Sequence, residues 1–162
     1  MPLLVNLRHL DAHNLRLQGE LPVQALDIDT RDEMIQMDQP LQHDLEVQKL
    51  SDSLLVQGRL RLVLECKCVR CLKPFQYPLE IKDWTCHLPL QGEERVVVTN
   101  DCVDLTPYVR EDILLAFPQH PLCKPDCGGL PKTSAGRGKQ TGKNGESEPV
   151  PSAWAALDKL KL

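Results

Sequence analysis

The sequence predicts an α+β fold in which a curved, barrel-like antiparallel β-sheet carries one main helix. Between 54 and 82, apolar and polar residues alternate along two arms, which is the pattern of half-buried β-strands. The same period of two runs through 41–50, so the three segments together predict an antiparallel meander. Near 107–117 the apolar spacing changes to that of a helix with one apolar stripe.

Length and composition limit the classes of protein that fit. A chain of 162 residues with 41% hydrophobic and 26% charged residues is an ordinary globular domain with a core, followed by a tail. A formal net charge of −4 argues against a protein that coats nucleic acid unaided, although it permits a local basic patch. The sequence shows no membrane-spanning run and no export signal. We therefore expect a cytoplasmic protein that does not bind membranes.

The first third of the chain predicts short elements around turns. Residues 3–7 form an expected first strand, and the mixed segment that follows ends at Gly19. A second strand is expected from 21 to 28, broken by Pro22. The acid-rich stretch 27–38 is expected to be a loop, and 41–50 then begins the meander.

A change of phase marks the second arm of the central hairpin. Apolar residues occupy odd positions up to Ile81 and even positions from Trp84 onward. One extra residue in a strand swaps its faces, so we expect a bulge or bend near Asp83. A further strand is expected at 95–99.

The main helix has recognisable boundaries. Thr106 is the expected N-cap, Pro107 suits the first helical position, and Pro118 ends the helix. Its apolar stripe is interpreted as core packing.

The chain divides into a domain over 1–130, a linker over 131–151 and an amphipathic tail helix over 152–162. The linker composition is too polar for a packed core. Its basic residues either contact RNA phosphate or are simply solvated, and the tail helix either packs on its own domain or binds a partner. The candidate RNA- or partner-binding residues are Lys132, Arg137, Lys139, Lys143, Trp154, Leu157 and Leu160.

Two cysteine pairs predict a metal centre. Cys68 and Cys71 lie on the hairpin tip, and Cys123 and Cys127 follow the helix. The two pairs are separated by 51 residues. Zinc prefers four soft ligands in a tetrahedron, and each pair supplies two. Seven cysteines in a chain with no export signal favour metal ligation over disulfides. We predict a structural zinc that joins the helix end to the hairpin tip, with free thiols as the alternative.

The other cysteines fit this site less well. Cys66 and His120 are spare candidate ligands, but Cys66 points away from the ligand side if the strand geometry holds, and His120 is expected in a loop. Cys86 and Cys102 have no partner spacing and are interpreted as packed small hydrophobes.

A thiol enzyme is the rival interpretation of the first pair. A redox-active Cys-x-x-Cys normally begins a helix, which lowers the thiol pKa, whereas Cys68 and Cys71 lie between two strands. The sequence contains no Ser/His/Asp arrangement, Walker loop or dinucleotide-binding fingerprint. We therefore expect no enzymatic activity and no small-molecule substrate.

Two segments resemble motifs of one bacterial family. The stretch 64–75 is similar to the C-x-R-C-L motif of the YceD family, and 104–118 resembles its D-L-x-x-x-V-x-E-x-I-L-L-A-x-P segment. The Pro-Leu-Cys at 121–123 and the closing Leu-x-x-Leu also fit. The extra Cys66 and the Gly/Lys-rich insert at 132–145 depart from the pattern.

The resemblance implies a role in ribosome assembly, through accumulation of the large-subunit (23S) ribosomal RNA and association with large-subunit ribosomal proteins. It places Cys68 and Cys71 on the family's first cysteine pair, and Cys123 and Cys127 on a second pair that varies among members. We expect a non-enzymatic ribosome biogenesis factor that binds ribosomal RNA, a large-subunit ribosomal protein, or both. The alternatives are an adaptor without RNA contact, and a thiol redox protein that uses Cys68 and Cys71. The sequence leaves the oligomeric state open.

Overall fold

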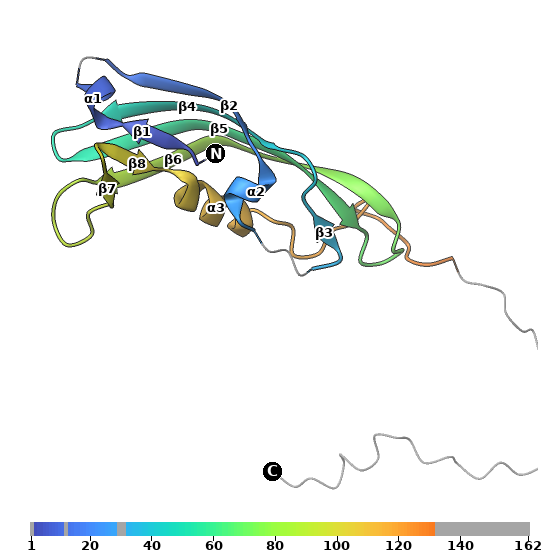
Figure 1. The fold of residues 1–162 in the computed structure, drawn as a ribbon. Helices are drawn as coiled ribbons and strands as arrows, with labels where there is room; N and C mark the ends of the chain where they lie inside the picture. Colours follow the sequence, from blue (N-terminus) through green and yellow to red (C-terminus); the bar gives the residue numbers. More distant parts are fainter. Residues whose placement is uncertain (1, 12, 29–31, 132–162) are drawn as a thin grey trace, which may run out of the picture. The chain divides into compact units, whose positions relative to one another are not determined.

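A computed structural model of the protein describes residues 2–11, 13–28 and 32–131 (Figure 1). The expected tail helix over 152–162, and the expected linker beyond residue 131, lie outside these residues. The described elements, in chain order, are β1 (Leu4–Asn6), α1 (Leu7–Leu10), β2 (Leu15–Leu21), α2 (Val23–Leu26), β3 (Ile35–Gln36), β4 (Leu41–Lys49), β5 (Ser53–Lys67), β6 (Pro74–Pro89), β7 (Val98–Thr99), β8 (Cys102–Asp104) and α3 (Thr106–Leu115).

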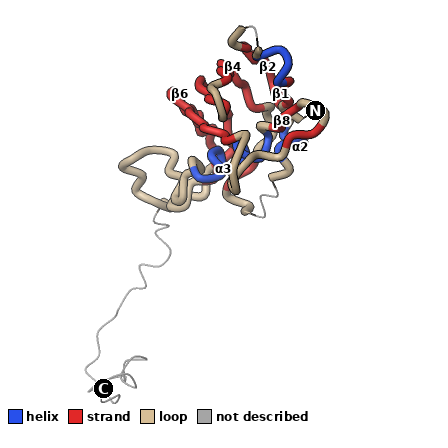
Figure 2. The backbone as a smooth tube through the Cα atoms, turned by 90° about the vertical axis from the view of Figure 1, so that its left-hand side faces the viewer, coloured by secondary structure: helices blue, strands red, loops and turns tan. Residues whose placement is uncertain are grey.

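One large antiparallel sheet dominates the described residues. β4 lies between β2 and β5, β6 pairs with β5 along its whole length, and β3 pairs with the end of β5. The sheet curls into a half-barrel, and α3 lies on its concave side (Figure 2). A small second sheet has the order β1-β8-β7. The predicted α+β class with a curved antiparallel sheet and one main helix is confirmed.

The core lies between the inner face of the large sheet and α3. Val109 and Ile113 of α3 are fully buried there. Each fully buried aliphatic side chain contributes about 1.5–3 kcal/mol. The indole nitrogen of Trp84 in β6 donates a 2.6 Å hydrogen bond to Asp112 Oδ2, which fixes the helix to the sheet. The inward residues of β4 and β5 in this core are Leu41, Leu45, Val47, Leu54, Val56, Leu60, Leu62 and Leu64.

The predicted bulge in the second arm of the hairpin is confirmed. Between the pairs Gly58–Trp84 and Leu60–Ile81, two residues of β6 face a single residue of β5. One of these two is Asp83, so the change of phase in the sequence corresponds to a real change of face.

The start of α3 differs from the prediction. The N-cap position is Leu105, which makes no side-chain capping bond, and Thr106 is already helical. Asp104 Oδ1 accepts the backbone N–H of Thr106 at 2.9 Å, and the Thr106 hydroxyl instead accepts the N–H of Leu3 at 2.8 Å. The predicted Thr106 cap is therefore wrong. Its hydroxyl accepts a hydrogen bond from the residue before β1, and the Asp104 carboxylate accepts the first N–H of the helix instead.

Three further predictions of strands and loops also differ from the structure. The strand expected at 21–28 is wrong: β2 ends at Leu21, and Pro22 precedes the short helix α2. The expected loop 27–38 contains β3, which forms because Ile35 pairs with Cys66 of the hairpin. Of the strand expected at 95–99, only the last two residues are in β7.

The close pairing of β4 and β5 leaves no room for a side chain at Gly58. A Cβ atom added to Gly58 would lie 2.1 Å from the backbone oxygen of Asp44 on β4, whereas one added to Gly19 of β2 would meet nothing closer than 3.5 Å. We predict that Gly58→Ala lowers the free energy of unfolding by about 2 kcal/mol or more, because backbone must move. Gly19→Ala is the matched control and should cost about 1 kcal/mol or less. Urea unfolding of both variants measures the difference, and equal midpoints would contradict this packing.

Candidate metal centre

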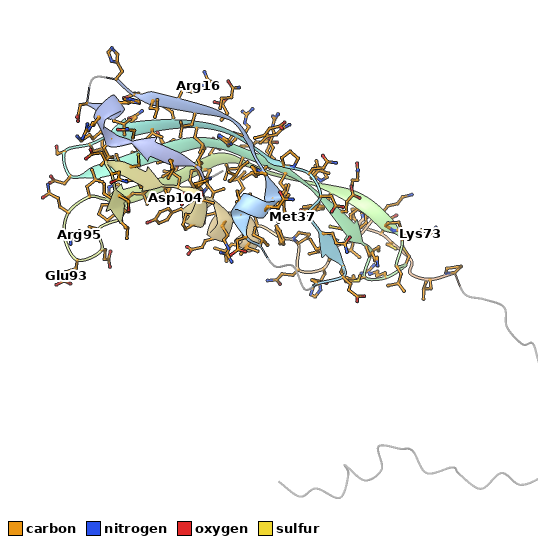
Figure 3. The ribbon with its side chains drawn as sticks, in the orientation of Figure 1. Arg16, Met37, Lys73, Glu93, Arg95 and Asp104 are labelled. Atoms are coloured by element: carbon orange, nitrogen blue, oxygen red, sulfur yellow. The ribbon has the colours of Figure 1, made fainter. Side chains whose placement is uncertain are left out.

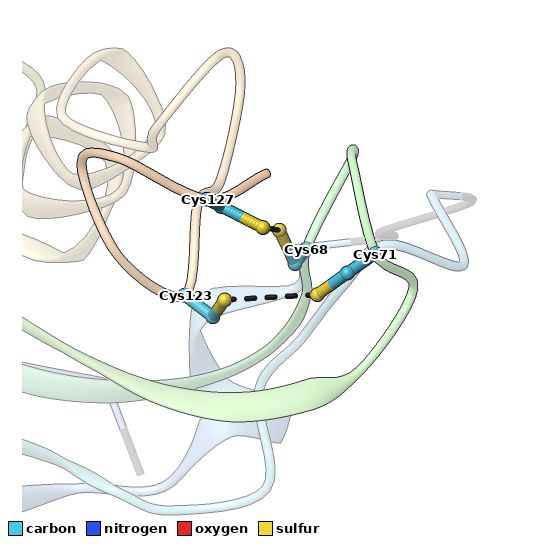
Figure 4. A group of neighbouring side chains, drawn as sticks. All are labelled: Cys68, Cys71, Cys123 and Cys127. Carbon is cyan, nitrogen blue, oxygen red and sulfur yellow. Dashed lines mark hydrogen bonds between the residues drawn. The ribbon is translucent and has the colours of Figure 1, made fainter. Parts of the chain in front are cut away.

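Four cysteines from two distant segments converge at the far end of the β5–β6 hairpin (Figure 4). Cys68 and Cys71 come from the turn between β5 and β6, and Cys123 and Cys127 come from the chain after α3. Their four sulfur atoms all lie within 4.8 Å of one another. The structure thus brings together the four residues that the sequence singled out.

The sulfur–sulfur distances suit a single tetrahedral ion. Cys68 Sγ lies 3.7 Å from Cys127 Sγ, and Cys71 Sγ lies 3.6 Å from Cys123 Sγ. A tetrahedral centre with metal–sulfur bonds of about 2.3 Å has sulfur–sulfur edges of about 3.8 Å. Both close pairs cross between the two segments, so an ion held here would join the hairpin tip to the chain after α3.

A tight backbone turn aims the first two sulfurs. The N–H of Leu72 donates to the Cys68 carbonyl at 2.8 Å, and the N–H of Cys68 donates to the Lys73 carbonyl at 2.9 Å. Leu72 has φ +60°, in the left-handed region that non-glycine residues seldom adopt. This turn reverses the chain within a few residues and leaves both thiols on one side, buried between the segments.

The second segment is tied to the tip by hydrogen bonds as well as by sulfur. The N–H of Val69 donates to the Pro121 carbonyl at 2.9 Å, and Arg70 Nη1 donates to the Cys127 carbonyl at 2.9 Å. Gly129 has φ +89°, so the turn after Cys127 uses the conformational freedom of glycine. The two segments therefore meet in a defined geometry before any ion is considered.

The electrostatics of the cluster favour a cation. Backbone N–H groups, that of Cys123 foremost, point at the Cys68 sulfur and lower its pKa to about 6. The hydrogen bond that Cys123 shares with Cys71, together with burial, raises the pKa of Cys123 to about 12. One thiolate forms readily and the next is resisted by its neighbours. A bound cation would relieve this repulsion and allow all four sulfurs to coordinate as thiolates.

The donor set is that of a closed, structural centre. Four sulfur ligands complete a tetrahedron and leave no open position for a substrate or water. The two spare candidates lie elsewhere, since Cys66 is buried in the core opposite Ile35 and His120 is exposed. Cys86 packs against the core, and burial raises its pKa to about 11. Cys102 is partly exposed on β8 and does not belong to the core, unlike the packed hydrophobe that was expected.

A serine–histidine contact escaped the sequence analysis. His87 Nε2 and Ser53 Oγ lie 2.9 Å apart, joined across β5 and β6. The two residues are 34 positions apart, and only the register of the hairpin brings them together. No carboxylate among the described residues is hydrogen-bonded to this histidine, so the pair lacks the third member of a catalytic triad.

The outer face of the large sheet carries paired charges. Arg16 binds both carboxylate oxygens of Asp44, at 2.9 and 2.8 Å, and holds the pKa of that carboxyl below its usual range. Arg61 donates to Glu80 at 2.8 Å, and Arg59 lies 3.7 Å from the same carboxylate. These cations are largely neutralised within the protein.

The remaining candidate residues lie outside the described part of the chain. These are the four basic residues Lys132, Arg137, Lys139 and Lys143 and the apolar tail residues Trp154, Leu157 and Leu160. Across the residues that the structure describes, no helix has the length and apolar character needed to cross a membrane.

Comparison with known proteins gives one family. Residues 56–161 match the family model described as "Large ribosomal RNA subunit accumulation protein YceD". The matched region exceeds half of the chain and contains both cysteine pairs and α3. No curated protein and no solved structure matches the chain.

Because the four sulfurs converge, we predict that the purified protein contains a bound metal ion. Protein purified without chelator should carry about one metal ion per chain by elemental analysis. Cys68→Ser and Cys123→Ser should each lose the ion and several kcal/mol of unfolding free energy, because metal binding is coupled to folding. Cys102→Ser is the matched control and should keep the metal. Full metal content in both ligand variants would contradict the site.

Proposed function

The chain belongs to the YceD family, and we propose that it is a non-enzymatic ribosome biogenesis factor. The family ties it to accumulation of the large ribosomal RNA subunit. We propose further that it acts by binding large-subunit ribosomal RNA, a large-subunit ribosomal protein, or both. The observation that carries the proposal is the family match over 56–161, which spans both halves of the cysteine cluster.

The chemistry of the cluster supports binding over catalysis. A four-sulfur centre offers no coordination position to a substrate, and the contact between Ser53 and His87 lacks an orienting carboxylate in the described residues. Both observations fit a protein that presents a surface.

Zinc is the ion that we propose for the cluster. Four cysteine sulfurs in a tetrahedral arrangement suit Zn²⁺, which is soft enough for thiolates and needs no redox change. Reduced thiols in a zinc centre are consistent with the cytoplasm, which we propose as the location of the protein.

The ion would act by fixing the hairpin tip. The structure describes two direct ties between the tip and the segment after α3 besides the sulfurs, the hydrogen bonds Val69–Pro121 and Arg70–Cys127. Two such bonds contribute only about 1–3 kcal/mol together, whereas a structural zinc contributes about 10 kcal/mol or more. The metal would therefore turn the tip into a rigid recognition element.

An adaptor without RNA contact is the second candidate. A groove of ≈ 470 Å³ beside β7 and β8 is lined in part by Leu4, Val97 and Tyr108. Leu4 and Val97 are 51% and 82% exposed, so the groove presents contiguous aliphatic surface to solvent. This groove favours a protein partner, and binding that survives nuclease treatment would support it.

A thiol redox role rests on the low pKa of Cys68, but access opposes it. The Cys68 side chain is fully buried and lies 3.7 Å from the Cys127 sulfur. A redox thiol must be reached by its partner, so a metal-bound, unreactive Cys68 would rule out this role.

The proposed function predicts a defect in large-subunit RNA. Cells that lack the protein should show a lower ratio of large- to small-subunit ribosomal RNA. Wild-type protein and the control Lys82→Gln, an exposed residue of β6 outside the cluster and the groove, should restore that ratio, and Cys68→Ser should fail because the tip is no longer held. An unchanged ratio in the deletion strain would contradict the proposal.

The same strains identify the class of partner. Affinity purification of the wild-type protein, with and without nuclease, should recover large-subunit components. Recovery that is lost after nuclease indicates RNA contact, and recovery that persists indicates a ribosomal protein. Recovery of no ribosomal component under either condition would contradict the role in ribosome assembly.

A further inference from the structure

The hairpin tip exposes aliphatic and cationic side chains next to each other. Val69, Leu72 and Leu130 are 41%, 57% and 60% exposed, and the surrounding basic residues are exposed too. Figure 3 shows Lys73 at the far end of the β5–β6 hairpin, away from the body of the sheet. We call these residues the tip surface: Lys67, Val69, Arg70, Leu72, Lys73, Lys124 and Leu130.

The tip surface concentrates cations in a chain that is negative overall. Residues 66–74 contain three cations and no carboxylate, and 121–131 contain Lys124 and Asp126, in a protein of formal net charge −4. The arginines of the outer sheet face are paired with carboxylates. At the tip, by contrast, no carboxylate of the described residues pairs with Lys67, Lys73 or Lys124. The cations there remain available to an external anion.

A metal–thiolate centre does not pair directly with the lysines of the tip surface. Four thiolates on a divalent ion carry two negative charges, and Asp126 is the one carboxylate within 66–74 and 121–131. Glu65 and Asp32 lie near Cys66, so carboxylates also border the tip on its β3 side. The sulfurs of Cys68 and Cys71 are buried, whereas the ammonium groups lie outside them in solvent. The unpaired lysines therefore lie in the layer that a partner would meet.

The turn at the tip explains the backbone of Leu72, but it does not explain why the residue is a leucine. Its φ of +60° lies in the left-handed region, where a glycine would be relaxed and a leucine is strained. Its side chain gains little from burial, because it is 57% exposed. A strained residue whose side chain is held out into solvent points to a role in recognition.

We propose that the tip surface binds RNA, with Lys67, Lys73 and Lys124 on backbone phosphates and Leu72 and Val69 against ribose or unstacked bases. This inference rests on the proposed function and names the partner of the cysteine clip, by which we mean the cluster of Cys68, Cys71, Cys123 and Cys127 with its ion. Unpaired cations favour a polyanion, and exposed aliphatic groups favour the splayed bases of single-stranded or loop RNA over a regular duplex. The clip makes the surface rigid, so less conformational entropy is lost on binding.

The test uses the full-length, metal-loaded protein. The probes are purified large-subunit ribosomal RNA and a fluorescent single-stranded RNA of mixed sequence, titrated between 50 and 200 mM salt. Lys67→Gln/Lys73→Gln should weaken binding and reduce the slope of log K against log salt by about 1.4, because each lost phosphate contact accounts for about 0.7. Lys82→Gln, an exposed lysine on β6 away from the tip, is the matched control and should bind as wild type.

Leu72→Gly separates recognition from folding. Glycine relieves the strained backbone, so the thermal midpoint and metal content should stay the same or rise. RNA affinity should fall about fivefold or more with no change in the salt slope, because an apolar contact is lost and no charge is changed. A leucine that served only the fold would show the opposite result, a lower midpoint and unchanged affinity.

The outcomes separate this inference from the proposed function. Tip variants that keep their metal and bind RNA like wild type overturn the inference. If replacing Lys132, Arg137, Lys139 and Lys143 by Gln abolishes RNA binding while the tip variants retain it, the inference fails and the proposed function stands. If wild-type protein binds neither probe, the inference fails together with the RNA part of the proposed function. The tip variants could instead fail to recover a ribosomal protein in nuclease-treated affinity purification while they still bind RNA. The tip would then be a protein-binding surface, and the RNA inference would be wrong.

Discussion

The convergence of four sulfurs is the interaction on which the functional end of this protein depends. The continuous hydrophobic core extends along the hairpin as far as Cys66, which pairs with Ile35 of β3. Cys68 and Cys71 lie beyond it and are buried without belonging to that core. The tip thus has a small interior of its own, made of thiols from two segments. A metal ion is the simplest way to make so few residues rigid.

The arginine charges of the sheet are paired, whereas several charges at the tip have no partner among the described residues. In the sheet, Arg16 and Arg61 meet carboxylates, and Trp84 anchors α3 through Asp112. At the tip, a leucine with positive φ and several cations face solvent. Natural proteins concentrate such costs where they bind something. The clip holds the hairpin tip in place without help from the hydrophobic core.

Local patterns in the sequence were sufficient for the hairpin and for the cysteine pairs. The period of two and its change of phase are properties of neighbouring residues, so the bulge near Asp83 was predictable. What failed depended on distant partners. β3 exists because the hairpin offers an edge to Ile35, and the Thr106 hydroxyl is drawn away from its helix by Leu3. The cysteine spacing predicted that the two segments of the cluster meet, but it did not reveal the bond from Arg70 to the Cys127 carbonyl.

A rigid tip requires one ion bound by all four sulfurs, and X-ray absorption at the metal edge tests this directly. Measured on the protein as purified, it should give zinc with four sulfur neighbours at about 2.3 Å and no nitrogen or oxygen. A shell that contains nitrogen or oxygen would mean that one of the cysteines is not a ligand. Absence of metal, with Cys68 and Cys71 freely reactive, would contradict the clip and return the tip to thiol chemistry.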